Sequence, residues 1–101
     1  MMNQVVILGR ICKDIQIEKE GDKEFATVTL AVQRSYKNEE GEYETDFIDA
    51  TLVGGVATQT AEYCRKGDLI GIKGRLESSL MGCKLIAEKV TFLSSGKPEE
   101  N

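Results

Sequence analysis

Two stretches of alternating apolar and polar residues are the strongest constraint on the fold of this chain. In residues 25–34 and 46–53, every second side chain is apolar and the intervening ones are more polar as a group. Side chains of a β-strand point alternately to its two faces, so a period of two predicts half-buried strands. The other face of each strand, which carries Phe47, is left for solvent or a ligand. The predicted core-facing residues are Ala26, Val28, Leu30, Val32, Ile48, Ala50 and Leu52.

Three further segments predict strands and one predicts a helix. The β-branched run of residues 4–17 predicts a long, bent first strand, with a bulge or a close backbone approach at Gly9. Residues 69–77 and 83–93 predict the last two strands. Apolar residues three and four apart in 56–64 predict a short helix, with a C-cap formed by the basic residues and glycine of 65–67. Residues 35–45 are hydrophilic and predict a long, exposed hairpin arm.

The order of three strands, a short helix and two strands matches the plan of a five-stranded oligonucleotide-binding barrel with Greek-key connections. We therefore expect a mainly β fold with the helix between the third and fourth strands. At 101 residues the chain is long enough for one core and too short for two. Residues 1–93 are predicted to form this one domain, and residues 94–101, which include Gly96 and Pro98, a disordered tail.

The net charge of −4 argues against a polyanionic partner, but the charges are unevenly distributed. Residues 38–49 contain six carboxylates and no cation, and removing those six from seventeen leaves eleven against thirteen lysines and arginines. Outside this acidic run the chain is thus mildly basic, which is compatible with phosphate binding. The acidic run itself is interpreted as a solvated arm.

Catalysis, metal binding and disulfide bonding are not expected. The chain has no histidine, and its three cysteines, Cys12, Cys64 and Cys83, are widely separated. Such cysteines suit small buried apolar side chains better than a disulfide framework, a metal site or a nucleophile–base pair. Asp46 and Asp49 are three apart in a strand and project to opposite faces, so they do not form a carboxylate pair. We predict no enzyme activity and no cofactor.

Neither a secretion signal nor a membrane span is expected. The first residues lack a basic region ahead of an apolar segment and a small-residue cleavage site, and no apolar run approaches the roughly 20 residues of a span. The expected location is the cytoplasm, in association with the nucleoid and with no membrane partner.

Four stretches of the chain resemble the bacterial single-stranded-DNA-binding protein family. They are MNQVVILGR (2–10), ATVTLAVQRSYK (26–37), GEYETDFI (41–48) and AEYCRKGDLIGIKGRL (61–76), and they occur in the family's own order. The resemblance covers nearly the whole chain to Leu93. It implies an oligonucleotide-binding barrel that binds single-stranded DNA without sequence preference in replication, recombination or repair.

The resemblance also implies where DNA is bound. Family members stack bases on aromatic side chains after the second strand and in the third, where this chain has Tyr36 and Phe47. Stacking tolerates any base and contributes about 1–3 kcal/mol per base. The alternative interpretations are sheet packing for Phe47 and a loop position closing over the barrel for Tyr36. Cations that could neutralise phosphates are Arg34, Lys37, Lys73, Arg75 and Arg10, the last of which could instead pair with a carboxylate of a neighbouring subunit.

The chain departs from the family's pattern in three places. Residues 52–56 lack the large aromatic side chain and the lysine usual there, and the hairpin of residues 77–83 is shorter than the usual basic, aromatic one. No linker ending in an acidic, phenylalanine-tipped segment, which in the family recruits other replication proteins, follows Leu93. These departures favour a second hypothesis, a tail-less primosomal replication protein of the PriB type that acts in replication restart through DNA and protein contacts. Tyr36 and Phe47 favour the general binder.

A homo-oligomer is expected as well. Val5, Val6, Ile7 and Leu8 place apolar side chains on both faces of the first strand, and both faces need burial. A second subunit would cover one of them, in a dimer or in a tetramer built from two dimers. Replication or restart proteins are further candidate partners.

Overall fold

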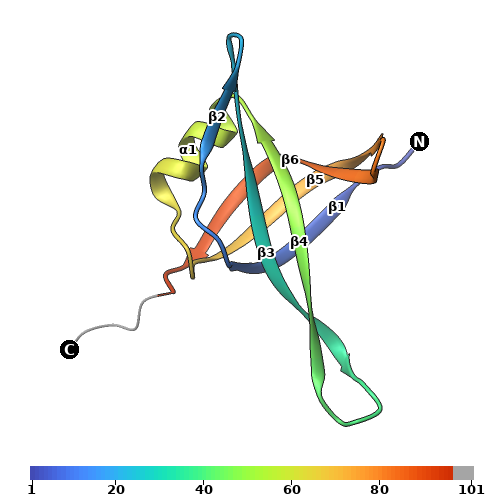
Figure 1. Ribbon diagram of the computed structural model, residues 1–101. Helices are drawn as coiled ribbons and strands as arrows, with labels where there is room; N and C mark the ends of the chain where they lie inside the picture. Colours follow the sequence, from blue (N-terminus) through green and yellow to red (C-terminus); the bar gives the residue numbers. More distant parts are fainter. Residues whose placement is uncertain (97–101) are drawn as a thin grey trace, which may run out of the picture.

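Six strands and one helix make up the part of the chain that the computed structural model describes, residues 1–96 (Figure 1). Strands account for most of these residues, which confirms the mainly β fold class. In chain order the elements are β1 (Val5–Ile11), β2 (Ile17–Glu20), β3 (Lys23–Lys37), β4 (Tyr43–Val53), α1 (Gly55–Tyr63), β5 (Leu69–Ser79) and β6 (Gly82–Ser94).

Five of the strands close into a barrel. Hydrogen-bonded neighbours follow the order β1-β5-β6-β4-β3-β2, and β1 also pairs with β3 through Arg10 and Ile11, which completes the circle. β4 and β6 run parallel, with Ala50 beside Leu85, whereas the other neighbours are antiparallel. β2 continues the sheet beyond β3 and lies outside the circle. This is the five-stranded oligonucleotide-binding barrel that the order of elements predicted.

The predicted first strand is divided in two. β1 ends at Ile11 and β2 begins at Ile17, so the continuous strand expected over residues 4–17 is a wrong prediction. The break lies where the barrel turns a corner: the Ile11 N–H donates to Asp68 O at 2.9 Å, and the Gly67 N–H donates to Ile11 O at 2.7 Å. Beyond this corner the chain continues along the same edge of β3, where β2 pairs with residues 23–26. When β1 and β2 count as one barrel strand, α1 lies between the third and fourth, as expected.

Gly9 lies at a close backbone approach, one of the two alternatives that the sequence left open. Pairing of β1 with β5 runs from Val5 to Arg10 without a register shift, so β1 has no bulge there. A Cβ atom on Gly9 would lie 2.7 Å from Ala31 O. A larger residue would push β1 away from β3 at the point where the barrel closes.

The core is aliphatic. The predicted inward faces of β3 and β4 are buried at Ala26, Val28, Leu30, Ala50 and Leu52, and Ala57 and Thr60 of α1 close one end of the barrel. None of the six aromatic side chains belongs to this core, because five are exposed and Phe25 is half-buried. The interior is thus filled without the side chains that usually dominate core energetics.

The helix ends earlier than its basic residues suggested. α1 stops at Tyr63, so Arg65 lies beyond the last turn instead of in it. Arg65 still caps the helix, because its Nη1 donates to the carbonyls of Ala61, Glu62 and Cys64 at 3.2, 2.7 and 3.0 Å. Within residues 1–96 no helix has the length and apolar character needed to cross a membrane.

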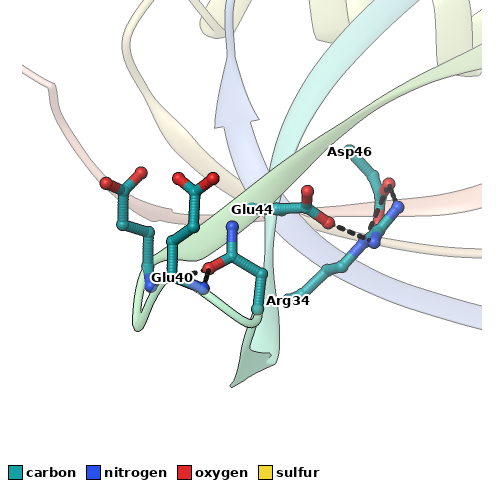
Figure 2. A network of polar contacts seen from close by, with 6 residues as sticks. Arg34, Glu40, Glu44 and Asp46 are labelled. Atoms are coloured by element: carbon teal, nitrogen blue, oxygen red, sulfur yellow. Dashed lines mark hydrogen bonds and ion pairs between the residues drawn. The ribbon is translucent and has the colours of Figure 1, made fainter.

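Two hairpins extend from the barrel. The predicted arm is present, but its sides are strands: β3 runs to Lys37 and β4 starts at Tyr43, and the ribbon projects well away from the barrel (Figure 1). Tyr36 therefore lies in a strand and not in a loop. At the arm's tip, Asn38 Oδ1 accepts hydrogen bonds from the N–H groups of Glu40 and Glu42 at 2.9 and 3.0 Å (Figure 2). The β5–β6 hairpin has a two-residue turn, since Ser79 pairs with Gly82.

Two smaller expectations need correction. Ser94 is the last residue of β6, and the Gly96 N–H donates to Asp68 Oδ1 at 3.1 Å, so the predicted tail cannot begin at residue 94. Residues 97–101, the rest of that prediction, lie outside the described residues. Cys64 is buried and Cys12 half-buried, but Cys83, on the β5–β6 hairpin, is exposed. Position 83 lies on the hairpin outside the barrel core, so its side chain is not enclosed.

Candidate nucleic-acid interface

A groove runs along the outer face of β3 and β4, here called the β3–β4 groove. It consists of three adjoining depressions. The middle one shares Thr27 and Asp49 with the depression on one side, and Thr51 and Lys84 with the depression on the other. Residues 13–18 form one wall. The β5–β6 hairpin forms the other, with the side chains of Leu80 and Met81 fully exposed at its tip. Barrels of this class bind oligonucleotides on the corresponding face.

Phe47 lies on the same outer face, next to the groove. It is 69% exposed, pairs in register with Ala31 and is two residues from Asp49. Its neighbours Ile48 and Ala50 contact or belong to the core, so the predicted alternation of faces is confirmed. The 69% exposure of Phe47 disfavours the packing alternative, because a ring packed in the sheet would be largely buried.

Arg34 lies on the other face of the β3–β4 ribbon and is already paired. Its Nε and Nη2 donate to Asp46 at 2.9–3.2 Å, and its Nη1 donates to Glu44 Oε2 at 2.6 Å (Figure 2). The hydrogen bonds from Arg34 hold the pKa of the Asp46 carboxyl below its ordinary value, and those to Asp46 raise the pKa of the guanidinium. Two carboxylates of the predicted solvated arm thus bind the cation that was expected to meet phosphate.

Tyr36 and Lys37 lie on the arm. Tyr36 is 62% exposed and is separated from Phe47 by the register shift between Gln33 and Lys37. The Lys37 ammonium lies 5.7 Å from the centroid of the Tyr43 ring, within the range of a cation–π interaction. The arm therefore carries exposed rings and a cation, which is the composition of a stacking surface.

The other candidate cations lie on a different side of the barrel. Lys73 is exposed on the outer face of β5, where it pairs in register with Val6 of β1 and Lys89 of β6. Arg75, on the same face, forms ion pairs with Glu77 at 2.6 Å and Glu88 at 3.3 Å. These positions are not beside Phe47, so the structure divides the predicted set between two surfaces.

Arg10 lies between these surfaces. Its Nη1 donates to Gly67 O at 3.1 Å, and it lines a small depression with Ala31 and Gln33, the neighbours of Phe47 across the ribbon. No carboxylate of residues 1–96 forms an ion pair with it.

Sequence reasoning missed three lysines of the β3–β4 groove. Lys13, Lys23 and Lys84 line it, and none forms an ion pair within residues 1–96. They come from a loop and from two hairpins, so no local pattern could have grouped them. Phe25 also lines the groove, and the alternation of residues 25–34 does place it on the face of Thr27 and Thr29. The groove also contains the carboxylates of Asp14, Glu18, Glu20 and Asp49.

The residues predicted for an oligomer interface divide between the two faces of β1. Val5 and Ile7 pack against the core, whereas Val6 and Leu8 are 71% and 54% exposed. From Val5 to Gly9 the strand pairs only with β5. The outward apolar side chains therefore accompany a strand edge that has no partner in the described part of the chain.

The fold defines an oligonucleotide-binding barrel, with an exposed aromatic ring beside the groove on the outer face of β3 and β4. In keeping with this, the sequence matches the model of the single-strand binding protein family over residues 2–91. It is 37% identical over 110 residues to single-stranded DNA-binding protein B of Bacillus subtilis (strain 168), covering 99% of this chain and 96% of that protein. The chain belongs to the single-strand binding protein family.

Two further similarities extend the comparison. The chain is 38% identical over 78 residues to a single-stranded DNA-binding protein of Staphylococcus epidermidis, covering 77% of this chain and 60% of that protein. The solved wild-type single-stranded DNA binding protein from Thermus aquaticus has the same fold, with a TM-score of 0.77 at 23% identity. The match covers 92% of this chain and 50% of that one, so the chain spans about half the length of the Thermus protein.

Proposed function

We propose that this chain binds single-stranded DNA without sequence preference, with the strand lying along the β3–β4 groove and a base stacked on Phe47. The exposed ring of Phe47 carries the proposal. A large, exposed apolar side chain on a partly polar sheet face gains little in the free protein, because it remains in contact with water. A stacked base removes that contact and contributes about 1–3 kcal/mol, whatever the base. The names of the relatives support the same ligand.

The groove's charge sets the strength of binding that we propose. Lys13, Lys23 and Lys84 are available to phosphates, but four carboxylates line the same groove. Stacking and apolar contacts with Leu80 and Met81 therefore contribute more than charge. Affinity should be modest, and each phosphate neutralised should add roughly 0.7 to the magnitude of the log–log salt slope. Binding of this kind would serve DNA replication, recombination or repair, in which single strands are exposed.

Replacement of Phe47 tests the proposal. Phe47→Ala should weaken binding of a fluorescently labelled oligo-dT by about 1–3 kcal/mol in an anisotropy titration, while Phe47→Tyr, which keeps the ring, should bind as the unsubstituted protein does. Both variants should unfold at the same temperature as that protein, because the ring faces away from the core. Tyr36→Ala is the parallel measurement on the arm.

The contrary outcomes separate the two functions considered. A folded Phe47→Ala and a folded Tyr36→Ala that both keep full oligo-dT affinity would remove the stacking assignment. The PriB-type role, in which contacts to partner proteins matter more, would then be preferred. A Phe47→Ala that melts much earlier, by about 3–5 kcal/mol of stability, would instead place the ring in the core.

We further propose that two copies of the chain associate through β1. An unpaired strand edge beside outward apolar side chains is a template for pairing with another strand. Antiparallel pairing of two β1 strands would place Val6 and Leu8 of both copies side by side on one face of the joined sheet, where each would partly cover the other; they are 71% and 54% exposed in one copy. A tetramer would form from two such dimers.

Light scattering tests this association. At micromolar concentration the protein should have twice the 11.2 kDa mass of one chain, or four times that mass. Val6→Lys with Leu8→Lys should give a folded monomer, because both side chains point outward and their replacement leaves the core unchanged. An unsubstituted protein that is monomeric would refute the proposal.

A further inference from the structure

A second depression with aromatic and basic side chains lies at the C-terminal end of α1. It is lined by Tyr63, Arg65, Lys66, Asp68, Phe92 and Ser95, and shares no lining residue with the β3–β4 groove. Tyr63 is 71% exposed and Phe92 is 51% exposed. Two of the five exposed aromatic rings of the molecule therefore gather at one point, away from the face already described.

The one carboxylate in this depression does not neutralise its cations. Asp68 is buried, and its Oδ2 accepts the Arg65 N–H at 2.8 Å while its Oδ1 accepts the Gly96 N–H at 3.1 Å. The Arg65 guanidinium donates only to helix carbonyls, and Lys66 is exposed with no ion pair in residues 1–96. The depression thus presents two rings and two cations that form no ion pair in residues 1–96, in a chain whose net charge is −4.

We propose that Tyr63, Lys66 and Phe92, here called the α1-end platform, form a second contact for the same DNA strand after it leaves the β3–β4 groove. A base stacks on one of the two rings, and the Lys66 ammonium neutralises a neighbouring phosphate. This inference rests on the proposed function. Rings interleaved with cations are the composition of surfaces that bind single strands of any sequence, because each base offers a π-face and each nucleotide a charge.

Arg10 lies between the two proposed DNA contacts. It lines the depression beside Ala31, which pairs with Phe47, and its guanidinium reaches the carbonyl of Gly67, the residue after Lys66. A strand running from Phe47 toward the end of α1 would pass this cation. The platform is therefore reached only by a strand longer than the groove itself.

The length of the DNA separates the platform from the groove. Binding is measured with an oligo-dT of about eight bases, toward the lower end of the roughly 4–16 nucleotides bound by one barrel, and with one of about thirty bases. Tyr63→Leu and Lys66→Gln should each raise the Kd for the longer strand, Tyr63→Leu by about fivefold or more, and leave the Kd for the shorter one unchanged. Tyr63→Phe, which keeps the ring, should bind both strands normally, and Phe47→Ala should weaken both.

Three outcomes would overturn the inference or the function beneath it. If Tyr63→Leu and Lys66→Gln bind both lengths with normal affinity while Phe47→Ala binds weakly, that result refutes the platform but not the groove. The two rings would then be assigned to contact with a protein partner. Equal weakening of both lengths by Tyr63→Leu would make Tyr63 part of the groove's own site, not a second contact. If the unsubstituted protein binds neither strand, the proposed function itself fails. Thermal melts of each variant test whether unfolding causes the loss of affinity. No loss of stability is expected, because Tyr63 is exposed at the end of the helix.

Discussion

The β3–β4 arm and the β5–β6 hairpin both leave the barrel as antiparallel ribbons that pair an arginine internally, but only the β5–β6 hairpin also contributes a lysine to the β3–β4 groove. On the arm, Arg34 is bound by Glu44 and Asp46, so the most basic side chain is neutralised inside its own ribbon. On the β5–β6 hairpin, Lys84 lies opposite Glu77 in the strand register, yet the Glu77 carboxylate forms its ion pair with Arg75, at 2.6 Å. Lys84 is left without an ion pair within residues 1–96 and lines the groove. The availability of a cation depends on its neighbours, not on its presence in the sequence.

The two ribbons also differ in where their register shifts. In the arm the shift lies between Gln33 and Lys37, outside the barrel, where side chains have room to adjust. In the β5–β6 pair one shift lies between Leu69 and Ile70, and a second lies between Lys73 and Gly74, beside the core. There a Cβ on Gly74 would be only 2.1 Å from Ile86 O. The backbone at the Gly74 shift is therefore more tightly constrained than the backbone at the shift in the arm.

Substitution of Gly74 should have the largest effect. Gly74→Ala forces a methyl group against the backbone of β6, and overpacking of this kind costs about 1–3 kcal/mol of stability, with the upper value expected because backbone cannot rotate away. Chemical denaturation measures it. Gly55→Ala is the matched control: its added Cβ meets nothing within 4 Å, and alanine favours the first turn of α1, so its stability should be unchanged or raised by up to about 1 kcal/mol. A Gly74→Ala variant as stable as this control would contradict the constraint.

Removal of one cation from each ribbon should give an intermediate effect. Lys84→Gln should lower the affinity for oligo-dT and reduce the log–log salt slope by roughly 0.7, because one phosphate contact is lost. Arg34→Gln should leave both quantities unchanged, since its charge is already bound by two carboxylates on the face opposite Phe47. Titrations at several salt concentrations measure both. If the two variants behave alike, the ion pairs of the arm open when DNA binds, and the contrast between the ribbons is lost.

The pH dependence of stability should show the smallest effect. Hydrogen bonds from Arg34 lower the pKa of Asp46, so the stabilisation they provide is complete above the pKa of the unfolded chain and is lost as the pH falls through the lower pKa of the folded protein. Asp46→Asn should therefore melt at a slightly lower temperature than the unsubstituted protein at pH 7, and the difference should begin to shrink near about pH 4, the ordinary pKa of an aspartate, and disappear only below the lowered pKa of the folded protein. Both groups are solvent-accessible, so the difference is small. Thermal melts between neutral pH and about pH 3 measure it, and a difference that does not shrink below about pH 4 would assign it to something other than the ion pair.

The fold was predictable because its signals are local. Alternation in residues 25–34 and 46–53 and the helical spacing of 56–64 identified the core faces of β3, β4 and α1 from sequence alone. The errors fell at the ends of elements and at the first corner of the barrel. There, the hydrogen bonds of Ile11 with Gly67 and Asp68, more than fifty residues away, divide β1 from β2. No window of neighbouring residues contains that information.

The candidate site was predictable only in part. Phe47 could be placed on an outward face because strand alternation requires no knowledge of other strands. Lys13, Lys23 and Lys84 could not be found, because only closure of the barrel brings a loop and two hairpins to one groove. The expectation that Arg34 and Arg75 would meet phosphate likewise could not take account of the cross-strand carboxylates that bind them.

By itself, the sequence determined the order of the elements, the face that each strand turns to the core and the strand face on which Phe47 lies, because these follow from the period of two and from short-range spacing. The tertiary structure alone decided which cations remain available, where the groove runs and that Tyr63 and Phe92, from the helix and the last strand, share one depression. The physical reason is that charge pairing and surface shape depend on residues that are distant in the chain and adjacent only after the barrel has closed.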